Sequence, residues 1–181
     1  MNNNSYYLAV SSPAKYVTKE HWYNENKPQA GAVYLINIDN LNGHYNLTDL
    51  SSMTTFYGDE EYGRLGWTIG FSPQSHRNND GSQHFWINAP WRNDGILPSS
   101  VDAGSSYFWH GGSNFPTGFT SNAQSVSDLC IQSSLGKSLY GATAQMLDFN
   151  GDGFIDIALG GPRDHSIAEN AGSVSILFNI V

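Results

Sequence analysis

Nine consecutive residues, from Asp148 to Asp156, carry side chains whose types and spacing suit the binding of a metal ion. Asp148, Asn150 and Asp152 stand at the first, third and fifth positions, and Asp156 stands at the ninth. Calcium prefers about six to eight oxygen ligands, and alternate positions of a tight loop supply them. The carbonyl of Phe154 at the seventh position and both carboxylate oxygens of Asp156 extend the set. The spacing predicts a calcium site formed by these five residues.

Two glycines within the segment, Gly151 and Gly153, allow the backbone to wrap closely around an ion. The alternative is an Asn-Gly hairpin turn with solvated acids. Such a turn does not require regular spacing of the acids, so the observed spacing favours the metal. No flanking helix is evident in the sequence, which excludes an EF-hand.

The elements that position this loop belong to an internal repeat. Three segments begin with Ala-Gly and continue as a β-prone run, and a second apolar run that ends in proline precedes each of them. The Ala-Gly segments are residues 30–36, 103–109 and 171–177, and the prolines are Pro13, Pro90 and Pro162. The order and the similar spacing of the two elements indicate three copies of one unit.

Each unit is predicted to hold about four strands. Glycine-containing runs at residues 63–71 and 136–147 open a unit, and the runs at 47–58 and 128–136 close one. No segment of useful length shows helical periodicity with caps. Four strands per unit are typical of a β-propeller blade.

The predicted fold is therefore all-β, as about three blades of a β-propeller that is incomplete at both ends. Residues 1–62 form a partial first blade with strands two to four, residues 63–135 a second blade, and residues 136–181 a partial third blade. Propellers close with about 4–8 blades. The remainder of the propeller is expected in a longer parent chain or in a partner chain.

The second unit aligns with the third without gaps when the two are matched on their prolines. His76 and His84 then replace the outer aspartates of the loop, whereas Asn78 and Asp80 are kept. Imidazole is a poor calcium ligand, so this loop is predicted to be degenerate. A histidine pair that holds a transition metal remains the alternative. In the first unit Tyr7 takes the place of Asp156.

The composition excludes several classes of function. The net charge is -8 and no Lys/Arg cluster occurs, which argues against nucleic acid and anionic membrane surfaces as partners. No apolar run is long enough for a membrane span, and the first residues lack the pattern of a signal peptide. The sequons at Asn3 and Asn46 are compatible with a secreted glycoprotein but do not establish one.

The sequence contains no recognisable catalytic set. Six scattered histidines form no known catalytic motif, and Asp164-His165 fits a solvated loop better than an acid–base pair. Cys130 is the single cysteine and fits a small buried side chain better than a reactive thiol. The aromatic runs at residues 84–91 and 105–112 fall on predicted strands and fit the core, with sugar stacking as the alternative.

A glycine-containing first strand, the loop D-x-N-G-D-G-x-x-D, a strand that ends near Gly-Ala-Pro, and then Ala-Gly with a β-run resemble the FG-GAP repeat of integrin α-subunit propellers. Leu65-Gly66 and Tyr140-Gly141 stand in place of the Phe-Gly of that repeat. The resemblance implies a propeller, usually seven-bladed, with calcium loops between the first and second strands. Similar repeats occur at the C-terminal end of proteins related to GPI-specific phospholipase D, and in some fungal lectins and polysaccharide-acting enzymes.

These observations predict a calcium-binding, non-catalytic propeller segment. The resemblance implies a secreted or lumenal parent protein similar to GPI-specific phospholipase D, a hydrolase whose zinc domain would lie outside this chain. The alternative is an integrin-like recognition module or lectin that binds a protein or glycan ligand, and a third candidate is an intracellular scaffold.

Overall fold

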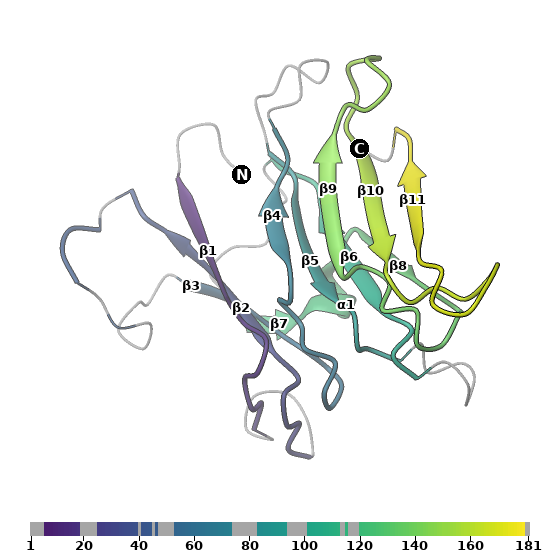
Figure 1. The fold of residues 1–181 in the computed structure, drawn as a ribbon. Coiled ribbons are helices and arrows are strands. Elements are labelled where there is room, and N and C mark those ends of the chain that lie inside the picture. The colour runs from purple at the N-terminus through teal and green to yellow at the C-terminus, as the bar shows by residue number, and fades with distance from the viewer. Residues whose placement is uncertain are drawn as a thin grey trace.

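The computed structural model describes residues 6–18, 25–39, 41–44, 46, 53–73, 83–93, 101–112, 115 and 120–179. Strands of these residues form three sheets, which follow one another in chain order across the molecule (Figure 1). The first sheet consists of β1 (Tyr7–Ser12), β2 (Ala32–Asn37), β3 (Met53–Tyr57) and β7 (Thr120–Asn122). The second consists of β4 (Ile69–Phe71), β5 (Phe85–Ala89), β6 (Ser105–Trp109) and β8 (Leu129–Gln132). The third consists of β9 (Thr143–Leu147), β10 (Asp156–Gly161) and β11 (Ser173–Leu177).

The prediction of an all-β fold is confirmed. One short helix, α1 (Ala123–Val126), follows β7, and the three sheets do not close into a ring. Strands that follow one another in the order of the repeat pair antiparallel within each sheet. No helix in the described part of the chain has the length and apolar character needed to cross a membrane.

The core lies between neighbouring sheets, because successive side chains of a strand point to opposite faces. In β5, Phe85 and Ile87 pack against the first sheet, where they meet Phe56. Trp86, between them in sequence, packs against Ile157 of the third sheet. The second sheet is therefore apolar on both faces, as expected for a layer that is covered on both sides. The preference for core over sugar stacking is confirmed for the aromatic residues on β5 and β6, all of which are buried.

The opening strands of the second and third units begin later than the sequence predicts. A strand was expected over residues 63–71, but β4 starts at Ile69, and β9 starts at Thr143 within the expected 136–147. The residues before them form turns that contain Gly66 and Gly141, with φ of +88° and +82°. These left-handed conformations are incompatible with an extended strand, which shortens both elements.

The turns form a junction that occurs twice with the same contacts. Leu65 lies against Gly31, where an added Cβ would meet the Leu65 carbonyl oxygen at 2.2 Å. Tyr140 lies against Gly104, where the corresponding distance is 2.1 Å. In each case the backbone N–H of the larger residue donates to the alanine that precedes the glycine, at 2.8 and 3.0 Å. Only glycine permits this approach, which explains the Ala-Gly pairs that mark the repeat.

The strand β7 was not anticipated. It comes from the connection between β6 and β8 of the second unit, yet it pairs with β3 of the first sheet in parallel orientation. The sequence of β7, Thr-Ser-Asn, is short and polar and carries no periodic signal. The pairing of β7 with β3 depends on the packing of the first two sheets, which the sequence pattern does not show.

Candidate metal centre

The segment from Asp148 to Asp156 connects β9 to β10 within the third sheet. Gly151 and Gly153 have φ of +76° and +90°, which is the left-handed region that glycine adopts most readily. An added Cβ at Gly151 would meet no atom within 4 Å, so this glycine is required by conformation and not by space. The loop is thus a tight turn that brings its side chains back toward its own backbone.

Asp148 organises the first half of the loop. Its Oδ1 accepts the N–H groups of Gly151 and Asp152 at 2.6 and 3.1 Å, and its Oδ2 accepts the N–H of Gly153 at 2.8 Å. Asn150 Oδ1 accepts the N–H of Asp152 at 3.0 Å. These contacts are local side-chain-to-backbone turns, which Asp and Asn favour.

Asp156 anchors the second half of the loop to the rest of the sheet. Its carboxylate is fully buried, and it accepts the N–H of Phe149 and the N–H of Asn179, both at 2.9 Å. One side chain therefore joins the loop to the chain segment that follows β11. Among the described residues, no Lys or Arg forms an ion pair with Asp148 or Asp156. A buried carboxylate without a nearby positive charge is costly, and a bound cation would lower that cost.

The donor types of the loop suit a hard cation, but the side chains do not stand in a ligand arrangement. Within the described ranges, no group of three or more His, Cys, Asp or Glu side chains is placed to hold a metal ion. The structure brings Asp148, Asn150, Asp152, Phe154 and Asp156 into one turn and directs their oxygens largely to backbone N–H groups. Calcium at this loop stays a prediction.

The corresponding loop of the second unit falls mainly outside the described residues, including His76, Asn78 and Asp80. His84 is described; it is buried, and its Nδ1 accepts the N–H of Gly111 at 3.2 Å. Its ring makes an edge contact with His110, with 5.7 Å between the ring centres. The histidine pair as an alternative metal site stays a prediction, because His76 lies outside the described residues.

Two further candidates are not placed for catalysis. Asp164 accepts the backbone N–H of Ser166 at 2.8 Å, and this bond holds the pKa of that carboxyl below its ordinary value. His165 beside it is exposed. Cys130 packs partly buried against the core between the first two sheets, and burial raises the pKa of its thiol. A raised pKa suppresses the thiolate, as expected for a structural cysteine.

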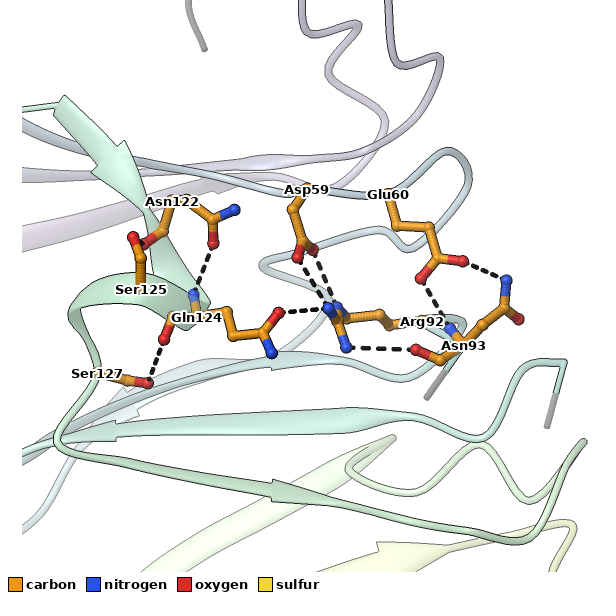
Figure 2. A network of polar contacts seen from close by, with 8 residues as sticks. All are labelled: Asp59, Glu60, Arg92, Asn93, Asn122, Gln124, Ser125 and Ser127. Atoms are coloured by element: carbon orange, nitrogen blue, oxygen red, sulfur yellow. Dashed lines mark hydrogen bonds and ion pairs between the residues drawn. The ribbon is translucent and has the colours of Figure 1, made fainter. Parts of the chain in front are cut away.

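A polar network that sequence reasoning missed joins the first two sheets (Figure 2). Arg92, which follows β5, donates through Nε and Nη2 to the two carboxylate oxygens of Asp59, at 2.9 and 2.8 Å. Its Nη2 also contacts Gln124 of α1, and Glu60 accepts the backbone N–H of Asn93 at 2.9 Å. The bonds therefore fix the end of β3 to the β5–β6 connection and to α1.

The pKa shifts in this network indicate a structural role. Burial alone would raise the pKa of Asp59, but the hydrogen bonds and the charge of Arg92 outweigh it and hold that pKa below its ordinary value. Burial raises the pKa of Glu60, against the opposing bonds from Asn93. A bidentate guanidinium–carboxylate pair fixes the relative position of its two chain segments, so the network stabilises the interface between the first two sheets. The individual residues are unremarkable in sequence, and no spacing rule would have linked them.

An aromatic pair lies at the surface near the first junction. The rings of Trp67 and Trp91 meet edge to face with centres 4.4 Å apart, and the guanidinium of Arg64 lies 4.7 Å from the Trp91 ring centre. Trp67 is 45% exposed, so this pair presents an aromatic surface to solvent. The sequence placed Trp91 within an aromatic run, and Trp67 was not singled out.

No protein-family model matches the chain, and no curated protein matches it.

Proposed function

We propose that the chain is a non-catalytic segment of a β-propeller in which the loop from Asp148 to Asp156 binds calcium and thereby stabilises the third blade. The observation that carries the calcium proposal is the buried carboxylate of Asp156, which joins the loop to the end of β11. A cation bound by the loop would neutralise this carboxylate and its neighbours. The role of the ion is to hold strands together and not to take part in a reaction.

The arrangement of the sheets supports a propeller. Three sheets of similar construction follow one another, and each buries an apolar face against the next. The repeated Ala-Gly junction gives successive sheets the same mutual contacts, as a radial repeat requires. The FG-GAP resemblance adds the expectation of a larger extracellular or lumenal protein similar to GPI-specific phospholipase D. A zinc-binding domain rich in His and Asp in that protein would favour a hydrolase, and further repeats alone would favour a binder.

Thermal unfolding with EDTA and with millimolar calcium tests the metal site. A ligand at about 100 times its Kd stabilises the folded state by about 2.7 kcal/mol. For a chain of this size that corresponds to a rise in Tm of about 5–10 °C. Asp152→Asn should abolish the rise, because the change removes a charged ligand and keeps an oxygen that can accept the N–H of Phe154.

Asp128→Asn is the matched control, since Asp128 is an exposed carboxylate that accepts the backbone N–H of His110, and asparagine keeps an oxygen for this bond. This variant should keep the calcium response of the unaltered chain. A melting curve that does not respond to calcium in the unaltered chain contradicts the proposal.

The second candidate function is recognition of a glycan or protein, and the Trp67–Trp91 pair favours it. Exposed indole rings stack on sugar faces and supply large contact area at interfaces. Trp67→Ala should then remove binding on a glycan array, whereas Tyr16→Ala, at another aromatic residue that is half exposed, should not. An array with no specific signal for the unaltered chain would exclude a lectin of broad specificity.

A further inference from the structure

The Ala-Gly turn occurs a third time, in the third sheet. Gly172 donates its N–H to Asp164 at 2.9 Å, as Gly104 donates to Arg92 at 2.8 Å and Gly31 to Lys15 at 3.1 Å. The residues two positions before the three glycines, Gln29, Asp102 and Asn170, all have positive φ, at 47°, 55° and 52°. The third sheet therefore presents the same local structure that forms the junction in the first two.

In the first two copies this structure is covered by the unit that follows. Gly66 fits so closely against Val33 that an added Cβ would lie 2.7 Å from the Val33 Cγ2 atom. Gly141 fits against Ser106 in the same way, with 2.5 Å to the Ser106 Oγ atom. Val33 and Ser106 are fully buried as a result.

The third copy is open in the described structure. The residue that corresponds to Val33 and Ser106 is Val174, and it is 73% exposed. It borders a hollow of about 530 Å³, which we call the third junction surface. That surface is lined by Gly160, Gly161, Pro162, Gly172, Ser173 and Val174. Ile176, two positions further along β11, is 47% exposed, whereas its counterparts Leu35 and Phe108 are 1% exposed.

The sheet edge beside this surface is open as well. In the described part of the chain β11 pairs with β10 alone, and it lies at the edge of the molecule (Figure 1). Its counterparts β2 and β6 each pair with a further strand, β3 and β8. An exposed apolar strand at a sheet edge is a site for strand addition.

In each covered copy, one short segment both pairs with the edge strand and covers the Ala-Gly turn. Residues 53–66 supply β3 and then Leu65-Gly66, and residues 129–141 supply β8 and then Tyr140-Gly141. Both segments follow their own third strand in the same polypeptide. The two covered copies therefore show which kind of segment fits the open third copy: a strand that is followed by a large residue and a glycine.

We propose that the third junction surface receives the entry segment of a fourth repeat unit joined after β11. This segment pairs with β11 as a fourth strand and then places a large residue followed by a left-handed glycine in the hollow. The backbone N–H of the large residue donates to the carbonyl of Ala171, as Leu65 and Tyr140 donate to Ala30 and Ala103. The inference rests on the propeller part of the proposed function and is independent of the calcium loop.

A C-terminal fusion tests the proposal. A second copy of residues 129–141, with its cysteine changed to serine, is added to the full chain through a Gly/Ser linker. The linker is chosen so that 15 residues separate Leu177 from the added strand. This is the number of residues, 38–52, that separates β2 from β3. Amide hydrogen exchange of Ser173–Leu177 is measured in EDTA, so that a failure of calcium binding does not affect the result.

The fusion should slow exchange in β11 by about tenfold or more relative to the chain with linker alone. The matched control carries valine in place of the glycine of the added copy that corresponds to Gly141, and it should lose the effect because valine strongly disfavours that φ and needs space. Val174→Lys in the fusion should lose it as well, and far-UV circular dichroism checks that this exposed substitution leaves the fold intact.

Three results would overturn the proposal. The first is unchanged exchange in the fusion, and the second is equal protection by the glycine and valine versions. The third is protection of β11 in the unaltered chain that rises with protein concentration, because the occupant would then be a second copy of the molecule.

Discussion

Replacement of Asp156 by asparagine tests how the candidate metal loop is held to the third sheet. The two side chains have nearly the same shape, so the change removes charge and one acceptor without opening a cavity. The carboxylate of Asp156 accepts two backbone N–H groups, from Phe149 and Asn179, on its two oxygens. Asparagine has one carbonyl oxygen, so one of these N–H groups loses its acceptor and faces an NH₂ group instead.

The magnitude follows from two opposing contributions. A hydrogen bond to a charged group contributes about 1.5–3 kcal/mol, and an unsatisfied buried donor costs about 1–3 kcal/mol. The variant no longer buries a charge, which offsets part of this loss when no cation is bound. We therefore expect a loss of about 1–2 kcal/mol in EDTA, which corresponds to a fall in Tm of about 2–8 °C for a chain of this length. In calcium the loss should be larger, because the variant also lacks the bidentate ligand.

Thermal or urea unfolding in EDTA and in calcium measures both values. Asp128→Asn serves as the control, and a change at this exposed site should stay within about 0.5 kcal/mol. Equal stability of Asp156→Asn and the unaltered chain in EDTA would refute the anchoring role of the two backbone bonds. An equal loss in EDTA and in calcium would instead refute Asp156 as a calcium ligand.

Three other predictions concern the contacts between sheets. Gly104→Ala should cost about 2–4 kcal/mol in unfolding experiments, because its Cβ would lie 2.1 Å from the Tyr140 carbonyl oxygen; Gly112→Ala, with positive φ but open space, should cost about 1 kcal/mol. Arg92→Lys should lower the stability by about 2 kcal/mol in urea unfolding, since lysine cannot reproduce the two parallel bonds to Asp59. The lowered pKa of Asp59 means that its contribution is complete above its ordinary value of 3.8 and is lost as the pH falls through the lower folded value. The stability difference between the unaltered chain and Asp59→Asn, measured by urea unfolding as a function of pH, should thus be constant near neutrality and shrink below pH 4.

Much of the strand order was predictable because the repeat marks it with backbone requirements. The Ala-Gly pairs precede β2, β6 and β11, and the prolines follow β1, β5 and β10 closely. A glycine that lies against a neighbouring backbone, such as Gly31 or Gly104, cannot be replaced easily by a larger residue. Its position in the sequence therefore indicates where the junction lies. The starts of β4 and β9 were misplaced because the residues before them look β-prone but lie in left-handed turns.

At the candidate site, the sequence predicted the local turn but not the contacts that depend on strand pairing. Sequence spacing placed Asp148, Asn150 and Asp152 in one tight turn, and the structure agrees on the turn. Spacing could not show that Asp156 reaches Asn179, because that contact depends on the pairing of β10 with β11. The Arg92–Asp59 pair was invisible for the same reason: the residues are 33 positions apart, and only the packing of two sheets brings them together.

The strand β7 has a consequence for how this molecule folds. Its pairing joins Thr55 to Thr120, a separation of 65 residues, so the edge of the first sheet is completed by chain that emerges much later in synthesis. Pairings of such long range slow folding, because the loop must close before the contact is gained. The first two sheets should consequently gain and lose structure together, as one cooperative block, instead of independently as in a simple repeat array. In a simple repeat array each unit contacts its neighbour only through packing. Here the three residues of β7 belong to the second unit and also form a strand in the sheet of the first.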